Sequence, residues 1–501
     1  MTPRANTSLR LFSTRLLTRP DQDRAPRPSL SAYSSAGGAQ RIVILGGGYA
    51  GFYTALRLRK RLRPGEAQVT IVDPRSYMTY QPFLPEAAAG SLEPRHVVVS
   101  LRRELPGVHV TNGRVSAVSH QDRTVTVTPE VGAPLTLHYD QLVVALGSVA
   151  RTLPVPGLED VGIGFKQVEE AIALRNHVLE RLEVAAAVHD PALRARALTF
   201  VFVGGGYAGT EAIAELEDMA RAAIALHDEL DVSDVRFVLV EASERILPEV
   251  REEMGAYTVE QLRSRGIDVR LQTRLASCVD GEVVLSDGTR MSTDTVVWTA
   301  GVTANPVLLE TDLPLDERGR LRCLPTLQAL GDAGPVPGVW GAGDCAAVPD
   351  VTGSPDATCS PSAQHAVRQA RVLGDNVVAV LRGAEPAEYR HRHVGSVASL
   401  GLHKGVADVY GFKVKGPAAW FMHRAYHLSR IPTFNRKVRV LLDWTLALFF
   451  RRELVALGRL EQPYAEFRSA AHAAPGTADR SAHQHRSARR HEHHQTSSTR
   501  G

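Results

Sequence analysis

The chain has 501 residues, of which 44% are hydrophobic and 22% are charged. This composition is ordinary for a globular protein of two or three domains and excludes a disordered or fibrous chain. The net charge of +4 identifies no partner and gives no reason to expect nucleic-acid binding. The four cysteines have no CxxC spacing, so they predict free thiols and neither a disulfide framework nor a metal site.

Both ends of the chain are predicted to be disordered tails. Residues 1–40 contain six Arg and two Asp without apolar periodicity, and an organellar transit peptide is the alternative reading. Residues 461–501 carry six His in a Ser, Ala and Arg background, for which loose metal binding is the alternative. Between the tails, strands alternate with helices, as in a doubly wound α/β protein.

Residues 41–73 have the order of a dinucleotide-binding unit. An apolar strand over 41–45 runs into Gly-Gly-Gly-Tyr-Ala-Gly, a helix follows to about residue 62, and a second strand over 69–72 ends in an acid, 22 residues after the last glycine. This order predicts a pyrophosphate on the helix N-terminus and ribose hydroxyls on the acid. The predicted binding residues are Gly46, Gly48, Tyr49, Ala50, Gly51 and Asp73.

The same pattern returns in the middle of the chain, so the sequence predicts two dinucleotides. A strand over 199–203 leads into a second Gly-Gly-Gly-Tyr-Ala-Gly, and a strand over 237–240 ends in Glu241; the longer connection predicts an insertion around 223–234. A carboxylate at Glu241 favours NADH because it would repel the 2′-phosphate of NADPH, although Arg245 leaves NADPH as the alternative. The predicted binding residues are Gly204, Gly206, Gly209 and Glu241.

A third motif, over 339–344, is a short apolar strand that ends in Gly343-Asp344. With the two glycine loops it resembles the flavoproteins that have two dinucleotide-binding domains. In that group the first loop and the late Gly-Asp motif hold FAD, and the second loop holds NAD(P)H. The small-residue segments over 142–148 and 296–302 resemble the strand ends that close each nucleotide site, which adds Ala145, Gly147 and Gly301 to the predicted binding residues.

The cysteines narrow the possible classes of electron acceptor. They form no redox pair of the kind that disulfide or sulfide oxidoreductases need, and Cys345 is interpreted as a small buried side chain. The chain then resembles the type II NADH dehydrogenases, which are single-subunit, non-pumping NADH:quinone oxidoreductases. Residues 77–86 resemble the family's loop near the flavin ring, with core packing as the alternative. Glu211 matches a family glutamate near the nicotinamide, the flavin and the quinone, with Glu215 as a weaker candidate.

The segment over 360–369 resembles the family's helix beside the quinone. Ser360 is its expected N-cap and Pro361 its first helical residue, and its positive end would point at the flavin. The family pattern Ala-Gln-x-Ala-x-Gln is matched by Gln364, but Arg368 replaces the second glutamine and Gln369 comes one position late, turned by about 100°. Arg368 is expected either to bond a quinone carbonyl or to form a salt bridge at the tunnel mouth.

The segment over 411–452 is basic and amphipathic. It holds nine Lys or Arg and one Asp, whereas the rest of the chain sums to −4. Its apolar run over 438–450 is shorter than the about 20 residues that span a bilayer. The pattern predicts an interfacial anchor on anionic lipid, and a core or dimerisation helix is the alternative.

These observations predict an α/β protein with two Rossmann-like domains and a C-terminal membrane-association region. The expected FAD domain is discontinuous, over 41–152 and 323–390, with an NADH domain over 153–322 inserted and the anchoring region over 391–460. The expected reaction passes hydride from NADH to N5 of FAD, and then two electrons to menaquinone or ubiquinone, without proton pumping. Predicted catalytic residues are Glu211, Gln364 and Arg368. A homodimer on the cytoplasmic face of the cell membrane is expected, or alternatively an organellar inner membrane.

Two rival functions remain open at this point. One is a soluble flavin reductase for a protein or thiol acceptor, in which the basic C-terminal patch would bind an acidic partner. The other is a membrane-associated flavoprotein that senses NADH without reducing quinone.

Overall fold

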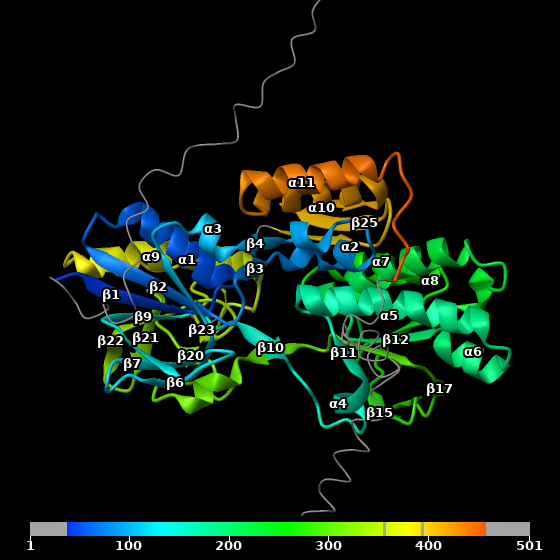
Figure 1. Ribbon diagram of the computed structural model, residues 1–501, viewed down its shortest axis with the longest axis horizontal. Helices are drawn as coiled ribbons and strands as arrows, with labels where there is room; N and C mark the ends of the chain where they lie inside the picture. Colours follow the sequence, from blue (N-terminus) through cyan, green and yellow to red (C-terminus); the bar gives the residue numbers. More distant parts are fainter. Residues whose placement is uncertain (1–37, 354–356, 392–394, 457–501) are drawn as a thin grey trace, which may run out of the picture.

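The computed structural model describes residues 38–353, 357–391 and 395–456. Both predicted tails, apart from residues 38–40, lie outside this part of the chain. Two lobes stand side by side, and two C-terminal helices lie above them (Figure 1). A six-stranded sheet forms the first lobe, in the order β21 (Gln328–Gly331), β22 (Gly334–Gly341), β9 (Gln141–Val144), β1 (Gln40–Leu45), β2 (Ala67–Asp73) and β5 (His109–Asn112).

The central strands of this sheet are parallel and lie between layers of the fold. β1 pairs with β2 on one side and with β9 on the other, and β9 pairs in turn with β22. The side chains from Ile42 to Leu45 are buried on both faces, as expected for a strand of a covered parallel sheet. Helices α1 (Tyr49–Arg61) and α9 (Ala363–Leu381) pack against each other beside it. The first lobe therefore draws its strands and helices from two separate parts of the chain.

The second lobe is built on a five-stranded parallel sheet, in the order β11 (Gly162–Gly164), β18 (Thr295–Trp298), β12 (Thr199–Val203), β13 (Arg236–Val240) and β14 (Asp268–Arg270). Helices α5 (Val168–Ala187) and α7 (Tyr207–Ile224) belong to this lobe. The extra length predicted around 223–234 lies in a helix of 18 residues, where α1 has 13, and in the loop that follows it. The expected α/β class, with one dinucleotide-binding unit inserted into another, is confirmed.

A short pair of strands joins the lobes. β10 (Ser148–Ala150) leaves the first lobe and pairs antiparallel with β19 (Val302–Ala304), which returns from the second, so that Val149 lies opposite Thr303. The predicted domain boundaries at 152, 322 and 390 stay predictions.

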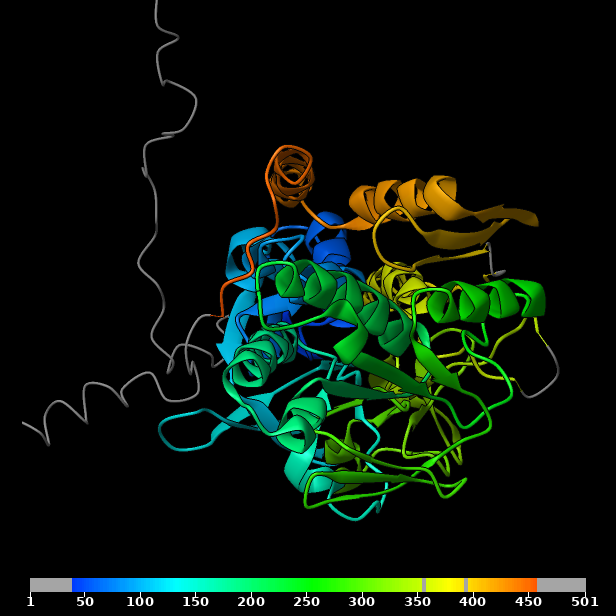
Figure 2. The same cartoon turned by 90° about the vertical axis from the view of Figure 1, so that its right-hand side faces the viewer.

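The C-terminal region forms a layer of its own. β24 (Gly395–Ser399), β25 (Gly405–Val409) and β26 (Phe412–Lys415) make an antiparallel sheet, followed by α10 (Gly416–Arg430) and α11 (Phe434–Leu446). The two helices lie on one edge of the molecule, near α2 (Leu84–Ala88) and α7 (Figures 1 and 2). The helix expected over 434–450 ends at Leu446, and no described helix is long and apolar enough to span a bilayer.

Short 3₁₀ helices lie at Gln81–Phe83, Pro94–His96, Val232–Asp234 and Pro306–Glu310. Smaller strands and α-helices complete the described chain. They are β3 (Tyr77–Thr79), β4 (Val98–Ser100), α3 (Leu101–Glu104), β6 (Arg114–Ser119), β7 (Thr124–Thr128), β8 (Leu135–His138), α4 (Leu158–Val161), α6 (Pro191–Ala197), α8 (Glu252–Arg263), β15 (Leu275–Val279), β16 (Glu282–Leu285), β17 (Arg290–Ser292), β20 (Leu321–Arg322) and β23 (Ala346–Ala347).

Candidate active site

The first glycine loop leaves no room for side chains at two of its positions. Gly46 has a φ of +101°, and a Cβ there would lie 2.3 Å from the carbonyl oxygen of Ala145. A Cβ on Gly51 would lie 1.8 Å from the carbonyl oxygen of Gly46. By contrast, a Cβ on Gly48, the N-cap of α1, would meet no protein atom within 4 Å. The loop is therefore closed toward the protein and open on the side where a ligand would approach.

The N-termini of α1 and α7 both lack a side-chain cap and an acidic residue in the first turn. Their first backbone N–H groups are thus left to bind an anion, which the helix dipole also favours. The second loop repeats the geometry of the first: a Cβ on Gly209 would lie 2.0 Å from the carbonyl oxygen of Gly204, and Gly206 is open. Two pyrophosphate groups fit these two helix ends.

Each predicted acid accepts a hydrogen bond from its own glycine loop. Asp73 Oδ2 accepts a hydrogen bond from Gly47 N at 2.7 Å, and Oδ1 accepts one from Arg75 N at 2.7 Å. Burial raises the pKa of Asp73, and these two backbone hydrogen bonds oppose that rise.

Glu241 makes the matching contacts in the second unit. Its Oε2 accepts from Gly205 N at 2.6 Å and its Oε1 from Ser243 N at 2.7 Å. Each acid therefore stands beside its loop, where its remaining lone pairs can accept the hydroxyls of a ribose.

The late Gly-Asp motif lies between two helix ends. A Cβ on Gly343 would be 3.2 Å from Cβ of Ala50 in α1 and 3.6 Å from Cβ of Ala366 in α9. Asp344 Oδ2 accepts a hydrogen bond from Ser148 Oγ at 2.6 Å. One predicted strand end also lies here, because the carbonyl oxygen of Ala145 is 2.3 Å from a Cβ placed on Gly46. An added Cβ on Gly147, as on Gly48, would meet no protein atom within 4 Å.

The prediction of Ser360 as the N-cap of α9 and of Pro361 as its first helical residue is wrong. α9 begins at Ala363, and Ser362 caps it by accepting a hydrogen bond from His365 N at 3.2 Å. Both serines stand before an apolar periodic segment, and in the structure it is Ser362 that accepts the N–H of the third helical residue.

Gln364 and Arg368 lie together on α9. Arg368 Nη1 donates to the Gln364 carbonyl oxygen at 3.1 Å and to its Oε1 at 3.3 Å, and Gln364 Nε2 donates to Gly395 O at 3.2 Å. The displaced Gln369 is buried and its Oε1 accepts from Gly343 N at 2.8 Å. Gln369 thus holds the Gly-Asp motif instead of joining the other two side chains.

Glu211 lies in another group of contacts. It is buried on α7, and its Oε1 accepts a hydrogen bond from Ser399 N at 2.8 Å and lies 3.2 Å from His423 Nε2. The structure therefore brings together Gln364 and Arg368, but it joins Glu211 to the C-terminal region.

The segment over 77–86 passes beside the first glycine loop. Tyr80 is buried, and its ring centroid lies 6.1 Å from that of Tyr49. Phe83 and Glu86 are also buried and pack under α10 and α11. The segment thus serves as core packing, which was the alternative, and also borders the predicted flavin side.

Sequence reasoning missed Lys166. Its Nζ donates to Ser148 Oγ at 2.5 Å, and that hydroxyl donates to Asp344, so the Ser148 hydroxyl links Lys166 to Asp344 through two hydrogen bonds. Burial lowers the pKa of Lys166, while Asp344 and Glu170 oppose that change. Gln81 Nε2 donates to the Lys166 carbonyl oxygen at 3.1 Å. No motif spacing marks this lysine, because it reaches the site from the loop after β11.

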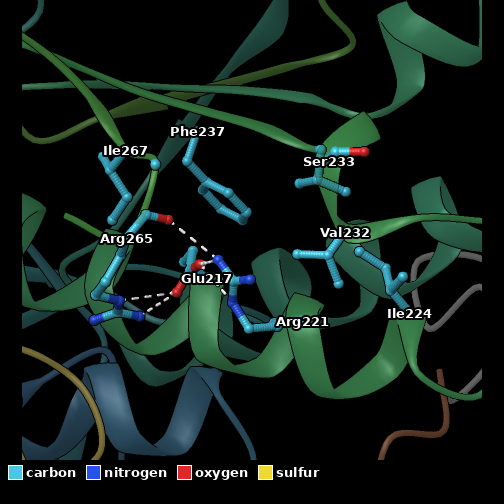
Figure 3. A pocket seen from close by; sticks show the side chains of 10 residues that line it. Glu217, Arg221, Ile224, Val232, Ser233, Phe237, Arg265 and Ile267 are labelled. Carbon is cyan, nitrogen blue, oxygen red and sulfur yellow. Dashed lines mark hydrogen bonds and ion pairs between the residues drawn. The ribbon is translucent and has the colours of Figure 1, made fainter. Parts of the chain in front are cut away.

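Neither the cysteines nor the cavity described below supplies a reactive group to the two glycine-loop sites. All four cysteines are free and buried, and burial raises the pKa of Cys345 to about 12. The described residues contain no group of three or more His, Cys, Asp or Glu side chains that could hold a metal ion. A cavity of about 380 Å³ is lined by Glu217, Arg221, Phe237 and Arg265 (Figure 3), and none of its lining residues belongs to either glycine loop.

Comparison with known proteins places this geometry in a family. Residues 40–370 match the pyridine nucleotide-disulphide oxidoreductases, and residues 393–453 match the NDH2 C-terminal domain. The chain belongs to the type II NADH dehydrogenases. As a member of that family it is an oxidoreductase, and the expectation of FAD and NADH as its cofactors is confirmed.

Relatives of the type II NADH dehydrogenases match most of the chain. The type II NADH:quinone oxidoreductase of Mycobacterium tuberculosis is 27% identical over 82% of this chain and 89% of its own length. The demethylphylloquinone reductase of Synechocystis is 30% identical over 81% of this chain and 95% of its own. The structure of NDH2 from Plasmodium falciparum in complex with NADH superposes with a TM-score of 0.77 at 17% identity, over 83% of this chain and 100% of that one.

Proposed function

We propose that this protein oxidises NADH through FAD and reduces a membrane quinone without pumping protons. The observation that carries this proposal is the match through both nucleotide units and the C-terminal domain to proteins named as type II NADH:quinone oxidoreductases. The Synechocystis relative, named a demethylphylloquinone reductase, supports a quinone as the acceptor.

The residues divide between two nucleotide sites. The first site, at the N-terminus of α1, would hold FAD. Its residues are Gly46, Gly48, Tyr49, Ala50, Gly51, Asp73, Ala145, Gly147, Gly343 and Asp344. In the second, Gly204, Gly206, Gly209, Glu241 and Gly301 would hold NADH. When bound, FAD supplies a hydride acceptor that passes two electrons on. The chain itself supplies position, since hydride transfer needs a stacked contact of about 3–3.5 Å.

The quinone would lie near Gln364 and Arg368. Arg368 forms no ion pair within the described residues, and its one hydrogen-bonded nitrogen is held by Gln364. This favours the first of its two expected roles, a hydrogen bond to a quinone carbonyl, over a salt bridge. Glu211, which accepts a hydrogen bond from Ser399 N of the C-terminal layer, would tune proton transfer or hold the path of the quinone.

A bilayer surface is the proposed partner of α11 and the turn that follows. Large apolar side chains stand exposed there, with Phe434 at 82%, Leu448 at 75% and Phe449 at 77%. An apolar stripe beside many Lys and Arg side chains suits the headgroup region of an anionic membrane. We place it on the cytoplasmic face of the cell membrane, with an organellar inner membrane as the alternative, and a homodimer as the expected assembly.

Stopped-flow mixing tests the reaction. The FAD-loaded protein is mixed with NADH and then with a short-chain menaquinone or ubiquinone analogue, while flavin absorbance is followed. We expect bleaching by NADH and rapid recovery with quinone. Bleaching without recovery would favour an NADH sensor, and faster recovery with a disulfide or an acidic redox protein would favour a soluble reductase.

Vesicle sedimentation tests the surface. The double variant Phe434→Ser, Phe449→Ser should weaken binding to vesicles with anionic lipid at least tenfold. Val131→Ser is the matched control because Val131 is 88% exposed in another part of the molecule. If the double variant binds lipid as the native chain does but changes its mass in sedimentation equilibrium, the exposed face is instead the dimer contact.

A further inference from the structure

Lys166 is a charged side chain beside the first nucleotide site, and the proposed reaction gives it no role. Its Nζ donates to Ser148 Oγ at 2.5 Å, and that hydroxyl donates to Asp344 Oδ2 at 2.6 Å. Asp344 belongs to the late Gly-Asp motif of the proposed FAD site. The ammonium of Lys166 is therefore joined by two hydrogen bonds to a residue that we assign to the flavin cofactor.

The lysine reaches this site from the other lobe. Lys166 stands in the loop between β11 and α5 of the second lobe (Figure 1), whereas Asp344 follows β22 of the first. Ser148, which lies between the two side chains, begins β10, the strand that leaves the first lobe toward the second. Lys166 thus brings a positive charge from the lobe of the proposed NADH site to the proposed FAD site.

The backbone around Lys166 is held from both sides. Its N–H donates to Glu170 Oε2 at 2.6 Å, and the N–H of Gln167 donates to the same oxygen at 2.8 Å, within the capping box that begins α5. The carbonyl oxygen of Lys166 accepts a hydrogen bond from Gln81 Nε2 at 3.1 Å. Gln81 lies in the segment over 77–86, which passes beside the first glycine loop. A backbone fixed in this way positions the ammonium before a ligand binds.

The ammonium has hydrogen-bond donors to spare. A lysine ammonium carries three N–H groups, and within the described residues Lys166 Nζ donates only to Ser148. Ser148, Lys166 and Asp344 are each partly exposed. Two N–H groups of Lys166 are thus left to donate to a bound ligand.

The chemistry of the expected ligand explains a positive charge at this place. A hydride from NADH brings two electrons and one proton to the flavin ring, so the ring gains one negative charge. A cation close to the ring stabilises that form and thereby tunes the cofactor. Burial lowers the pKa of Lys166, but the charges of Asp344 and Glu170 act in the opposite direction and favour the ammonium form.

The N-terminus of α9 is the other source of positive charge that was expected at the flavin. A helix N-terminus amounts to about half a unit charge. One of its free N–H groups, that of His365, already donates to the cap Ser362. An ammonium is a compact charge of a whole unit, so Lys166 should have the larger effect on the ring at equal distance.

We infer that Lys166 contacts the bound flavin and raises its two-electron reduction potential by stabilising the negative charge of the reduced ring. The inference rests on the proposed function, which places FAD at the first nucleotide site. It adds to that site a residue that belongs to neither glycine loop.

Equilibrium measurements on the full-length, FAD-loaded protein test this role without turnover. Sulfite adds to N5 of the flavin and leaves the ring negatively charged, so its affinity reports a positive charge near the ring. Lys166→Met should weaken sulfite binding at least tenfold in an absorbance titration. In an anaerobic redox titration its potential should be lower by about 30 mV or more, because 30 mV is a tenfold effect for a two-electron couple. Lys166→Arg keeps the charge and should recover most of both values.

Two further variants separate charge near the ring from other effects. Lys60→Met removes one positive charge at an exposed position of α1 and should leave sulfite affinity and potential unchanged. Ser148→Ala removes the hydroxyl between Lys166 and Asp344 but keeps the ammonium, so it should change sulfite affinity less than threefold.

Two results would overturn the inference. The first is a native sulfite affinity and potential in Lys166→Met. The second is an equal loss in Ser148→Ala, which would assign the effect to the hydrogen bond of Asp344. If Lys166→Met fails to hold FAD, Lys166→Gln takes its place, because it removes the charge but keeps a hydrogen-bond donor, and the same tenfold loss is expected.

Failure of the proposed function would look different. If Asp344→Asn bound FAD as tightly as the native chain does, FAD would not lie at the first site. If NADH bleached the flavin but quinone never reoxidised it, the proposed reaction would be wrong. Neither measurement involves a change at Lys166.

Discussion

At the residue scale, an acidic side chain binds the glycine loop of each nucleotide unit in the same way, although the two acids differ in length. Asp73 and Glu241 each accept a backbone N–H from the second glycine of their loop, at 2.7 and 2.6 Å. The acid therefore sets the shape of the loop before any ribose binds.

The charge of Glu241 should determine the preference between nicotinamide nucleotides. Glu241→Gln keeps the side-chain shape but removes the repulsion of a 2′-phosphate, so the ratio of kcat/KM for NADH over NADPH should fall at least tenfold. Steady-state kinetics with both nucleotides measures the ratio. Glu244→Gln, an exposed neutralisation three residues further on, is the control and should leave the ratio unchanged. An unchanged ratio in Glu241→Gln would place the specificity elsewhere.

Two glycines of the first loop should respond in opposite ways to alanine. Gly46→Ala meets the Ala145 carbonyl oxygen and a strained φ, so it should lower the free energy of unfolding of the apoprotein by about 1–3 kcal/mol. Gly48→Ala meets no protein atom, so it should leave apoprotein stability nearly unchanged and weaken FAD binding. Thermal unfolding and FAD titration measure the two effects. Normal FAD affinity in Gly48→Ala would show that the pyrophosphate does not bind at the N-terminus of α1.

At the element scale, α11 is held by Asp443, whose Oδ2 lies 2.6 Å from His96 Nδ1, and by a buried hydrogen bond from Trp444. Trp444 Nε1 donates to Glu86 Oε2 at 2.7 Å, and Arg424 Nη2 lies 3.2 Å from the same oxygen. Arg424 also lies over the ring of Trp444, 4.8 Å from its centroid. This contact accounts for the burial of Trp444, whereas Leu441, Leu442 and Leu446 of the same helix stay exposed.

Removing that hydrogen bond should loosen α11 without unfolding the lobes. Trp444→Phe leaves the buried carboxylate with one fewer donor, a change that costs about 1–3 kcal/mol. Limited proteolysis should then cut faster between α10 and α11. Phe434→Ser, a change at an 82% exposed position of the same helix, should not alter the cutting rate. Equal cutting in the native chain and Trp444→Phe would show that other contacts hold the helix.

The sequence predicted those helices, strands and loops that are specified by residues close together in the chain. Strand, glycine loop, helix and acid follow one another over residues 41–73 in the first unit and 199–241 in the second, so local spacing was enough to place Gly46, Asp73 and Glu241. The start of α9 was misplaced by two residues because Ser360 and Ser362 both suit a cap. Lys166 and His423 were missed because their partners come from distant parts of the chain, where no local spacing records the contact.

At the scale of the whole molecule, charge is unevenly distributed. Residues 411–452 carry nine Lys or Arg and one Asp, against a net charge of +4 for the chain. Such a distribution should orient the protein toward an anionic surface before contact, and salt should screen it, since the Debye length falls from about 10 Å at 0.1 M to 3 Å at 1 M.

Vesicle binding should therefore depend on both salt and lipid charge. Raising the salt concentration from 0.1 to 1 M should weaken binding to anionic vesicles severalfold, while the weaker binding to neutral vesicles should change little. Co-sedimentation at each salt concentration measures both. If salt changes binding to both kinds of vesicle equally little, the interaction rests on apolar contact alone.

The divided first lobe has a consequence for the order in which the protein is made. β1 and β9 leave the ribosome early, but β22, which pairs with β9, and α9, which packs on α1, follow only after the whole second lobe. The second lobe, the proposed NADH site, can thus fold during synthesis, while the first sheet waits with an open edge. The proposed FAD site, with Gly343 between α1 and α9, is completed last, so we expect the cofactor to be loaded late, after α9 has been made.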